Sequence, residues 1–221
     1  MKVIVTGGAG FIGSHLVDAL ISLKSEVFVL DNLSSGKKEN IHPKAEFIEI
    51  DITDRRILKI FEKIQPEIVF HLAAQINVRR SVEDPVEDAR INILGSINIL
   101  EASHAFSARK IIFASSGGAL YGDTNVVPTP EDHSAQPISP YGIGKFTVEN
   151  YLYYYRQVFG LSSTSLRYAN VYGPRQNAKG EAGVVAVFCE RIISGNTPVI
   201  YGDGKQTRDY VYVEDVVSAN I

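Results

Sequence analysis

The feature that most constrains the fold is a glycine-rich run over residues 7–13, placed directly after a short apolar segment. Residues 3–6 predict a buried strand, and apolar residues at helical spacing over residues 12–23 predict a helix. Strand, glycine turn and helix in this order are the context that a dinucleotide-binding fingerprint requires. Glycines let the backbone approach a pyrophosphate, which the helix N-terminus attracts. The run satisfies both G-x-x-G-x-x-G and G-x-G-x-x-G through Gly7, Gly8, Gly10 and Gly13.

A second strand supports the same interpretation. Residues 27–30 are apolar and end in Asp31, at the distance where an acid accepts hydrogen bonds from an adenosine ribose. The charge of Asp31 would repel a 2′-phosphate, so NAD is favoured over NADP, although Lys37 and Lys38 weaken this inference slightly. No Gly-Lys-Ser/Thr follows the glycines, which argues against an ATP-binding loop.

A tyrosine and a lysine four residues apart form the candidate catalytic pair. Tyr141 and Lys145 share one face of a predicted helix. An ammonium beside a phenol favours the phenolate, so we expect a Tyr141 pKa below its ordinary value near 10, suited to proton transfer near neutral pH. An ordinary helix pair has the same spacing, but here Ser115 and Ser116 follow a predicted strand over residues 110–114 and the glycine run precedes both.

Strand and helix signals alternate along the chain. Alternation of this kind predicts an α/β fold with a Rossmann-like, doubly wound parallel sheet. We expect a NAD-binding domain over residues 1–170 and the start of a smaller substrate-binding region over residues 171–221. That region looks incomplete, because a helical pattern over residues 213–221 reaches the last residue without a cap signal. Further strands are predicted at residues 47–50, 68–72 and 162–168, helices at 55–63, 86–106 and 141–159, and an active-site loop at 117–140.

Composition excludes several classes of protein. The 221 residues are 45% hydrophobic, enough for one sizeable core, and the net charge of −3 gives no reason to invoke nucleic acid or an anionic membrane. No apolar run reaches membrane-spanning length, no signal peptide fits before the first strand, and no cluster has metal-ligand spacing. The single cysteine, Cys189, suits a cytoplasmic protein and lies in an apolar pattern that predicts a packed core thiol.

Several polar or aromatic residues are interpreted as structural rather than as catalytic or ligand-binding. His71 follows an apolar strand and is expected to be a hydrogen-bonded structural histidine, and His15 is expected to pack or cap locally. The acidic residues at positions 83, 84, 87 and 88 predict a solvated helix start favoured by the helix dipole. A group of tyrosines spans more than one helix face and predicts core and subunit-interface contacts. They are Tyr151, Tyr153, Tyr154 and Tyr155.

Taken together, the motifs resemble those of the extended short-chain dehydrogenase/reductases that act on nucleotide sugars, the NAD-dependent epimerase/dehydratase family. Within that family the chain is most similar to the UDP-glucose 4-epimerases, whose members usually extend further than residue 221. The motifs, which come in the family's order, are Thr6-Gly7-Gly8-Ala9-Gly10-Phe11-Ile12-Gly13-Ser14-His15, Asp31-Asn32-Leu33-Ser34-Ser35-Gly36, Asp51-Ile52, His71-Leu72-Ala73-Ala74, Ser115-Ser116, Tyr141-x-x-x-Lys145 and Leu166-Arg167-Tyr168-Ala169-Asn170-Val171-Tyr172-Gly173-Pro174-Arg175.

The resemblance implies a role for each motif. NAD would be held at its pyrophosphate, ribose, adenine and nicotinamide by Gly7, Gly10, Phe11, Ile12, Gly13, Asp31, Asn32, Leu33, Ser34, Ser35, Gly36, Asp51, Ile52, Leu72, Ala73, Ala74, Asn92, Tyr141, Lys145, Tyr168 and Ala169. The UDP-sugar would be bound by Ser116, Tyr141, Asn170, Val184 and Arg208. Two positions depart from the epimerase pattern and put single substrate contacts in doubt, Ile76 where a lysine is frequent and Gly183 where an asparagine is frequent.

The implied reaction is inversion at C4 of the sugar. Tyr141 would take the proton of the 4-hydroxyl, Lys145 would support the phenolate, and Ser116, or less favourably Ser115, would hydrogen-bond the same oxygen. NAD would accept the C4 hydride and return it to the opposite face of a transient 4-keto sugar, so that the cofactor stays bound. A homodimer joined by the helices over residues 86–106 and 141–159 is also implied.

Other functions on the same fold remain open. A UDP-N-acetylglucosamine 4-epimerase would use the same machinery. A 4,6-dehydratase carries an Asp-Glu pair directly after the active-site serine or threonine, and a decarboxylase a glutamate, whereas Gly117-Gly118-Ala119 stands here. A non-catalytic NAD-binding regulator could keep the glycines, but it would not need the serine, tyrosine and lysine that this chain retains.

Overall fold

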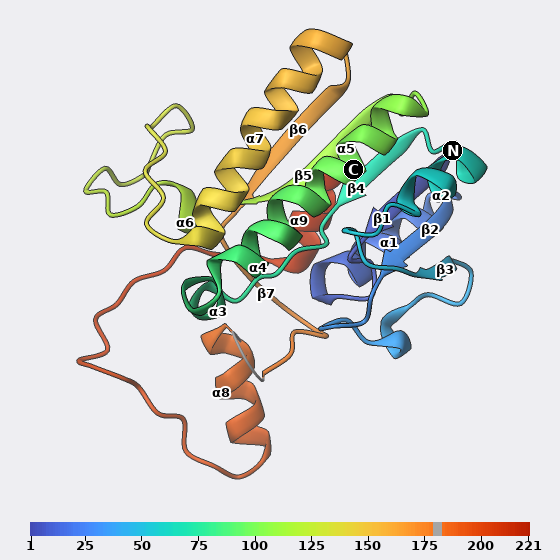
Figure 1. The fold of residues 1–221 in the computed structure, drawn as a ribbon. Helices are drawn as coiled ribbons and strands as arrows, with labels where there is room; N and C mark the ends of the chain where they lie inside the picture. The colour runs from blue at the N-terminus through green and yellow to red at the C-terminus, as the bar shows by residue number, and fades with distance from the viewer. Residues whose placement is uncertain (179–182) are drawn as a thin grey trace.

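A computed structural model describes residues 1–178 and 183–221 of the chain. Its main feature is a six-stranded parallel sheet in the order β3-β2-β1-β4-β5-β6 (Figure 1). The order reverses between β1 and β4, which is the switch point at which doubly wound sheets bind ligands. The predicted α/β, doubly wound parallel sheet is therefore confirmed. The strands are β1 Lys2–Thr6, β2 Glu26–Asp31, β3 Glu46–Glu49, β4 Ile68–His71, β5 Lys110–Ser116 and β6 Ser162–Tyr168.

Helices cover both faces of this sheet (Figure 1). One face packs against α2, α5 and α7, and the other against α1 and α9. The helices are α1 Phe11–Ser22, the 3-10 helix η1 Lys38–Asn40, α2 Ile57–Ile64, α3 Val78–Glu83, α4 Pro85–Ala89, the π-helix η2 Arg90–Gly95, α5 Ser96–Ala105, α6 Gly117–Leu120, α7 Pro140–Phe159, α8 Val184–Ile193 and α9 Val213–Asn220.

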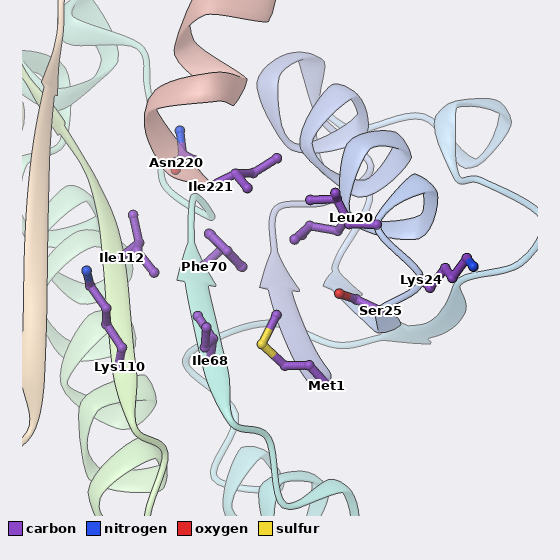
Figure 2. Close-up of a pocket in the computed structure, with 11 residues that line it drawn as sticks. Met1, Leu20, Lys24, Ser25, Ile68, Phe70, Lys110, Ile112, Asn220 and Ile221 are labelled. Carbon is purple, nitrogen blue, oxygen red and sulfur yellow. The ribbon is translucent and has the colours of Figure 1, made fainter.

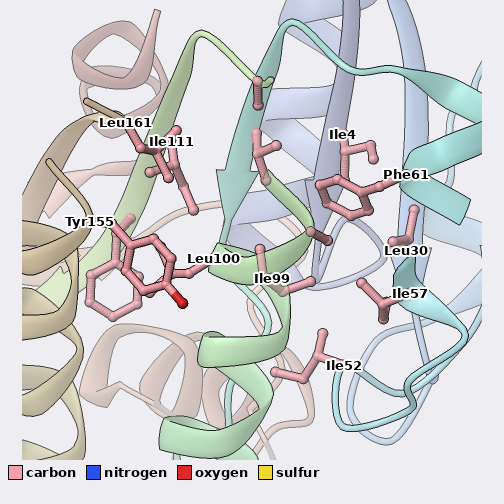
Figure 3. Close-up of a cluster of buried hydrophobic side chains, with 14 of the residues drawn as sticks. Ile4, Leu30, Ile52, Ile57, Phe61, Ile99, Leu100, Ile111, Tyr155 and Leu161 are labelled. Carbon is pink, nitrogen blue, oxygen red and sulfur yellow. The ribbon is translucent and has the colours of Figure 1, made fainter. Parts of the chain in front are cut away.

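The core follows from the alternation of side chains along the strands. In β1, Ile4 points to the cluster with α2, α5 and α7, while Val3 and Val5 point to the cluster with α1 and α9. Figure 3 shows the larger cluster, where Phe61 of α2 lies with Ile4 and Leu30. Each such fully buried side chain contributes about 1.5–3 kcal/mol. The two clusters hold the carboxyl ends of the strands in fixed positions.

The helix predicted over residues 86–106 is a continuous helical stretch with a π-helical turn inside it. It begins with α4, widens in η2 and continues as α5. Gly95 sits in the wide turn, where a Cβ would come within 2.7 Å of the Ile52 side chain. Turns of this kind are frequent at functional sites, and this one carries the buried Asn92.

The segments after β6 differ from the sheet. The short strands β7 Asn170–Tyr172 and β8 Tyr210–Tyr212 pair in parallel, and α9 returns to pack on α1. The helix α8 has no buried residue (Figure 1). The predicted core position of Cys189 is therefore wrong, because this thiol lies exposed on α8. None of the helices in residues 1–178 and 183–221 is long and apolar enough to span a membrane.

Candidate active site

Glycines shape the turn between β1 and α1 because side chains would not fit there. Gly7 has φ of +71°, and a Cβ on it would come within 2.7 Å of the Ala73 backbone nitrogen. A Cβ on Gly13 would collide with the Gly7 carbonyl oxygen. The N-cap residue Gly10 offers no side chain to the first N–H groups of α1. These groups are therefore available to an anion, which fits the pyrophosphate of a dinucleotide.

Asp31 fixes the loop that follows β2. Its buried carboxylate accepts hydrogen bonds from the backbone N–H groups of Ala9 at 3.0 Å and Leu33 at 2.8 Å. The same loop continues through Ser34 and Ser35 to Gly36, where a Cβ would come within 2.9 Å of the Ala9 Cβ. The ribose-binding loop expected from the sequence thus packs directly against the glycine turn.

Asp51 lies beside this loop. Its carboxylate accepts hydrogen bonds from Asn32 Nδ2 at 2.8 Å and from both the backbone and the hydroxyl of Thr53. Burial opposes its ionisation, but these hydrogen bonds outweigh burial and lower the Asp51 pKa. Ile52 is buried against Gly95. The predicted adenine and ribose residues therefore lie together at one edge of the sheet.

Tyr141 and Lys145 share a face of α7, as their spacing predicts. Ser139 caps this helix by accepting a hydrogen bond from the Gly142 backbone at 3.1 Å, and Pro140 occupies its first turn. Lys145 is buried, and its Nζ lies 5.8 Å from the centre of the Tyr141 ring. The same ammonium donates to the Ala114 carbonyl oxygen at 2.8 Å. The pair therefore faces the carboxyl end of β5.

The predicted lowering of the Tyr141 pKa is wrong. Burial raises this pKa to about 12, and the charge of Asp88 adds to the increase, while a hydrogen bond with Ser116 opposes it. Burial also lowers the Lys145 pKa to about 8, against the effect of Asp88. Desolvation is therefore the largest influence on the phenol, and it outweighs the hydrogen bond with Ser116.

Ser115 and Ser116 have different hydrogen-bond partners. Ser116 hydrogen-bonds with Tyr141. Ser115 is buried and donates to Glu149 Oε1 at 2.6 Å, and Glu149 forms an ion pair with Arg167 at 2.7 Å. The geometry thus places Ser116 rather than Ser115 at the phenol, in agreement with the order of preference expected from the sequence.

Asp88 is a buried acid beside α7 whose burial the sequence does not predict. It was expected in a solvated helix start, but only 2% of its surface is exposed, because α4 packs that position against α7. Its Oδ1 accepts hydrogen bonds from Gln75 Nε2 at 2.8 Å and Asn92 Nδ2 at 2.9 Å. Its position four residues before Asn92, on the same helix face, is the signal that could have identified it.

Asn92 and His71 are both satisfied inside the protein. Asn92 accepts from the Gln75 backbone at 2.8 Å and donates to its carbonyl oxygen at 2.9 Å. His71 hydrogen-bonds with Thr6 Oγ1 at 2.7 Å and Ser96 Oγ at 2.8 Å, and burial lowers its pKa to about 3. The structural interpretation of His71 is confirmed, and the histidine ties β1 to α5.

Comparison with known proteins assigns the fold and these motifs to one family. The model of the NAD dependent epimerase/dehydratase family matches residues 3–221. A putative UDP-glucose 4-epimerase of Methanocaldococcus jannaschii is 52% identical over 219 residues, covering 99% of this chain and 72% of that protein. The chain belongs to the NAD-dependent epimerase/dehydratase family.

Solved structures agree with this assignment. A Thermotoga maritima UDP-glucose 4-epimerase with UDP-glucose has 55% identity and a TM-score of 0.98, covering 100% of this chain and 72% of that one. A Methanobrevibacter ruminantium UDP-N-acetylglucosamine 4-epimerase in complex with UDP-N-acetylmuramic acid has 42% identity and a TM-score of 0.94, covering 99% and 71%. The relatives thus include enzymes named for two kinds of UDP-sugar.

The residues expected to bind substrate in this family member are less enclosed than the tyrosine and lysine. Asn170 donates from its side chain to the Asp209 carbonyl oxygen at 2.9 Å, so it lies beside the segment that carries Arg208. Arg208 is exposed and donates to the Thr207 carbonyl oxygen, and Val184 is exposed at the start of α8. Among the described residues, no hydrogen bond or ion pair joins Arg208 or Val184 to Tyr141.

Tyr168 and His15 each form a hydrogen bond that the sequence did not predict. The hydroxyl of Tyr168 hydrogen-bonds with Asn220 of α9, and burial raises the Tyr168 pKa to about 12. Ala169 links β6 to β7. His15 packs on Phe11, as expected locally, but it also hydrogen-bonds with the Pro174 carbonyl oxygen at 2.9 Å. It therefore connects α1 to a segment far away in the sequence.

A hollow at the amino ends of the central strands is not the candidate site. It has a volume of about 220 Å³ and is lined by Met1, Ile68 and Lys110, near the amino ends of three strands (Figure 2). Ligands of doubly wound sheets bind at the carboxyl ends, where Ser116 and the glycine turn lie. The part of the chain that the structure describes also holds no cluster of His, Cys, Asp and Glu arranged for a metal ion.

Proposed function

We propose that the chain is a nucleotide-sugar 4-epimerase that interconverts UDP-glucose and UDP-galactose with NAD kept bound. The observation that carries this proposal is the Tyr141 phenol, hydrogen-bonded with Ser116 and one helical turn from Lys145, at the carboxyl end of β5. A proton donor and acceptor in this position serves oxidation of a sugar hydroxyl.

The residues of the glycine turn fit NAD. The free N–H groups at the start of α1 would bind the pyrophosphate, and Asp31 and Asn32 would bind the adenosine ribose through the acceptor positions that their internal bonds leave open. Asp51 and Ile52 would flank the adenine. When bound, NAD supplies a reversible acceptor for hydride.

The reaction at the sugar is carried by three side chains. As a phenolate, Tyr141 accepts the proton of the 4-hydroxyl while C4 is oxidised, and it returns that proton when C4 is reduced on its other face. Ser116 hydrogen-bonds the same substrate oxygen. Lys145 stabilises the phenolate form of Tyr141, which takes this proton and re-forms when the proton is returned. The same proton and hydride that leave the sugar return to it, so the overall reaction is redox-neutral.

Three alternatives differ in substrate, in reaction outcome or in having no catalytic role. A UDP-N-acetylglucosamine 4-epimerase would use the same three side chains, and a relative so named supports that possibility. A dehydratase or decarboxylase needs an acidic side chain directly after Ser116, where this chain has Gly117 and Gly118. A non-catalytic regulator would not need the buried tyrosine and lysine. Epimerisation is therefore the function that the residues support best.

The assembly we propose is a homodimer formed through α5 and α7. Tyr153, Tyr154 and Phe159 of α7 are exposed aromatic residues, and an exposed apolar surface of this kind fits a second copy of the chain. Tyr155 of the same helix is buried. Light scattering that gives a strictly monomeric mass would contradict the dimer. A single cysteine and a UDP-sugar substrate support a cytoplasmic location and a role in galactose metabolism.

The decisive experiment is an assay with four sugars. The purified protein is incubated with UDP-glucose, UDP-galactose and their N-acetylhexosamine counterparts without added NAD, and the products are identified by NMR. We expect interconversion of UDP-glucose and UDP-galactose. Conversion of the N-acetyl pair alone would favour the first alternative, and a 4-keto-6-deoxy product without epimerisation would show a dehydratase.

A further inference from the structure

Asp88 is a buried acid that the proposed reaction does not use. Two amide donors, Gln75 Nε2 and Asn92 Nδ2, fix its Oδ1. These donors come from different parts of the chain, the segment after β4 and the π-helical turn η2. Gln75 and Asn92 are in turn joined by two hydrogen bonds of their own. The carboxylate therefore has one position, set by a closed amide network rather than by solvent.

The second oxygen of Asp88 faces α7. A Cβ on Gly144 would lie 3.6 Å from Asp88 Oδ2 and 3.4 Å from the Asn92 Cβ. A glycine at this position lets α4 and η2 approach α7 closely. Gly144 immediately precedes Lys145 and lies one turn after Tyr141, so the carboxylate packs against the helix between the two groups of the proposed reaction.

We propose that Asp88 is a positioning residue whose buried carboxylate, held by Gln75 and Asn92 against Gly144, is the countercharge that keeps the ammonium of Lys145 protonated inside the protein. A buried ammonium without a countercharge loses its proton readily. Lys145 also donates to the Ala114 carbonyl oxygen, but that group carries no net charge. In a reaction that requires a cation beside the phenol, Asp88 would therefore maintain the cation.

The electrostatics agree with the geometry. Burial lowers the Lys145 pKa, and Asp88 is the charge that opposes this shift. Burial raises the pKa of Asp88 itself, while its two amide donors and Lys145 favour the ionised form. The titratable groups around the pair are Tyr141 on α7, His71 on β4, and Glu87 and Arg90 next to Asp88. His71 is neutral, and Glu87 and Arg90 pair with each other.

The first test follows the titration of Lys145 itself. Protein labelled with ¹³C at lysine Cε is titrated by NMR, and the Lys145 signal is assigned by its loss in Lys145→Met. In Asp88→Asn, which keeps an oxygen for the two amide donors, we expect the midpoint to fall by about one pH unit or more, a tenfold increase in the acid dissociation constant. The matched control Glu83→Gln removes an exposed charge from neighbouring α3, and we expect it to move the midpoint by less than about 0.2 pH unit. Equal shifts in the two variants would overturn the proposal.

The second test remains informative if Asp88→Asn folds poorly. We expect the double variant Asp88→Asn/Lys145→Met to have a higher melting temperature than Asp88→Asn, because the uncompensated ammonium is gone. In the control background of Glu83→Gln, where Asp88 still compensates the ammonium, we expect adding Lys145→Met to give a smaller increase. A double variant that is no more stable than Asp88→Asn would refute the role of countercharge. The role of Asp88 in catalysis rests on the proposed function, but neither test uses substrate, so the two proposals fail separately.

Discussion

The two sides of the candidate site are built differently. On the sheet side, Lys145 and Ser115 are buried and Tyr141 is partly buried, and each is held by hydrogen bonds to neighbouring elements. On the side that follows β6, Arg208 and Val184 are exposed. Groups that transfer protons must keep one geometry, and the core fixes them. The difference predicts which substitutions affect chemistry and which affect binding.

Tyr141→Phe should have the largest effect on catalysis, on the buried side. Loss of a proton-transferring group lowers kcat by about 10²–10⁴-fold. The change removes one oxygen and keeps the ring, so we expect KM and the melting temperature to change little. Steady-state kinetics with UDP-galactose and a thermal melt measure both. The matched control is Tyr153→Phe on the same helix, where 66% of the side chain is exposed, and it should leave kcat unchanged. Full activity in Tyr141→Phe would remove the basis of the proposed reaction.

Ser116→Ala and Ser115→Ala separate chemistry from packing within the buried side. We expect Ser116→Ala to lower kcat by about 10–100-fold at nearly constant stability, because it removes a hydrogen bond at the reacting oxygen. Ser115→Ala removes a hydrogen bond to the carboxylate of Glu149, which lowers the free energy of unfolding by about 1.5–3 kcal/mol. Steady-state kinetics and urea unfolding of both variants measure the change in kcat and the change in the free energy of unfolding. The reverse pattern would make Ser115 the catalytic serine.

Arg208→Ala tests the exposed side. If Arg208 binds the pyrophosphate of the UDP-sugar, its loss should raise KM about tenfold or more, since a charge-assisted hydrogen bond contributes about 1.5–3 kcal/mol. The free energy of unfolding should stay within about 0.5 kcal/mol of wild type because the side chain is exposed. Steady-state kinetics gives the KM, and urea unfolding gives the free energy of unfolding. A large loss of stability with unchanged KM would contradict the proposed division between the two sides.

The same division explains how much the sequence predicted. The glycine turn, the strands and the Tyr141 helix follow from local patterns, and they are all found in the fold. The prediction that Asp88 is solvated was wrong. An acid at a helix start is ordinarily exposed, but the packing of α4 on α7 buries this one. The prediction that Cys189 is buried was wrong for the opposite reason. Its apolar pattern indicates a core position, but α8 has no buried residue. Burial depends on the partners of an element, which local periodicity does not specify.

The pKa of Tyr141 shows the same limit in electrostatics. Spacing places the ammonium and the phenol on one face, and both are there. The acidity of the phenol depends on the balance between desolvation, which raises its pKa, and the hydrogen bond with Ser116, which lowers it, and desolvation dominates. The sequence correctly predicted that Tyr141 and Lys145 are neighbours. It did not predict how far the fold removes them from solvent.

The smallest expected effect is the contribution of Lys145 to the pH dependence of stability. It reports how well the buried side of the site excludes solvent. Its pKa is about 8 in the folded protein and near 10.5 in the unfolded chain. Between these values the unfolded state binds more protons, so unfolding becomes less favourable as pH rises. We expect wild type to gain stability relative to Lys145→Met from pH 8 to pH 10, by at most about 1.4 kcal/mol per pH unit. The difference between their unfolding free energies, measured in urea at several pH values, isolates this group because all other titrations are shared. A difference that stays constant or falls with pH would mean that solvent reaches the ammonium, and the buried side would then be no better enclosed than the side that carries Arg208.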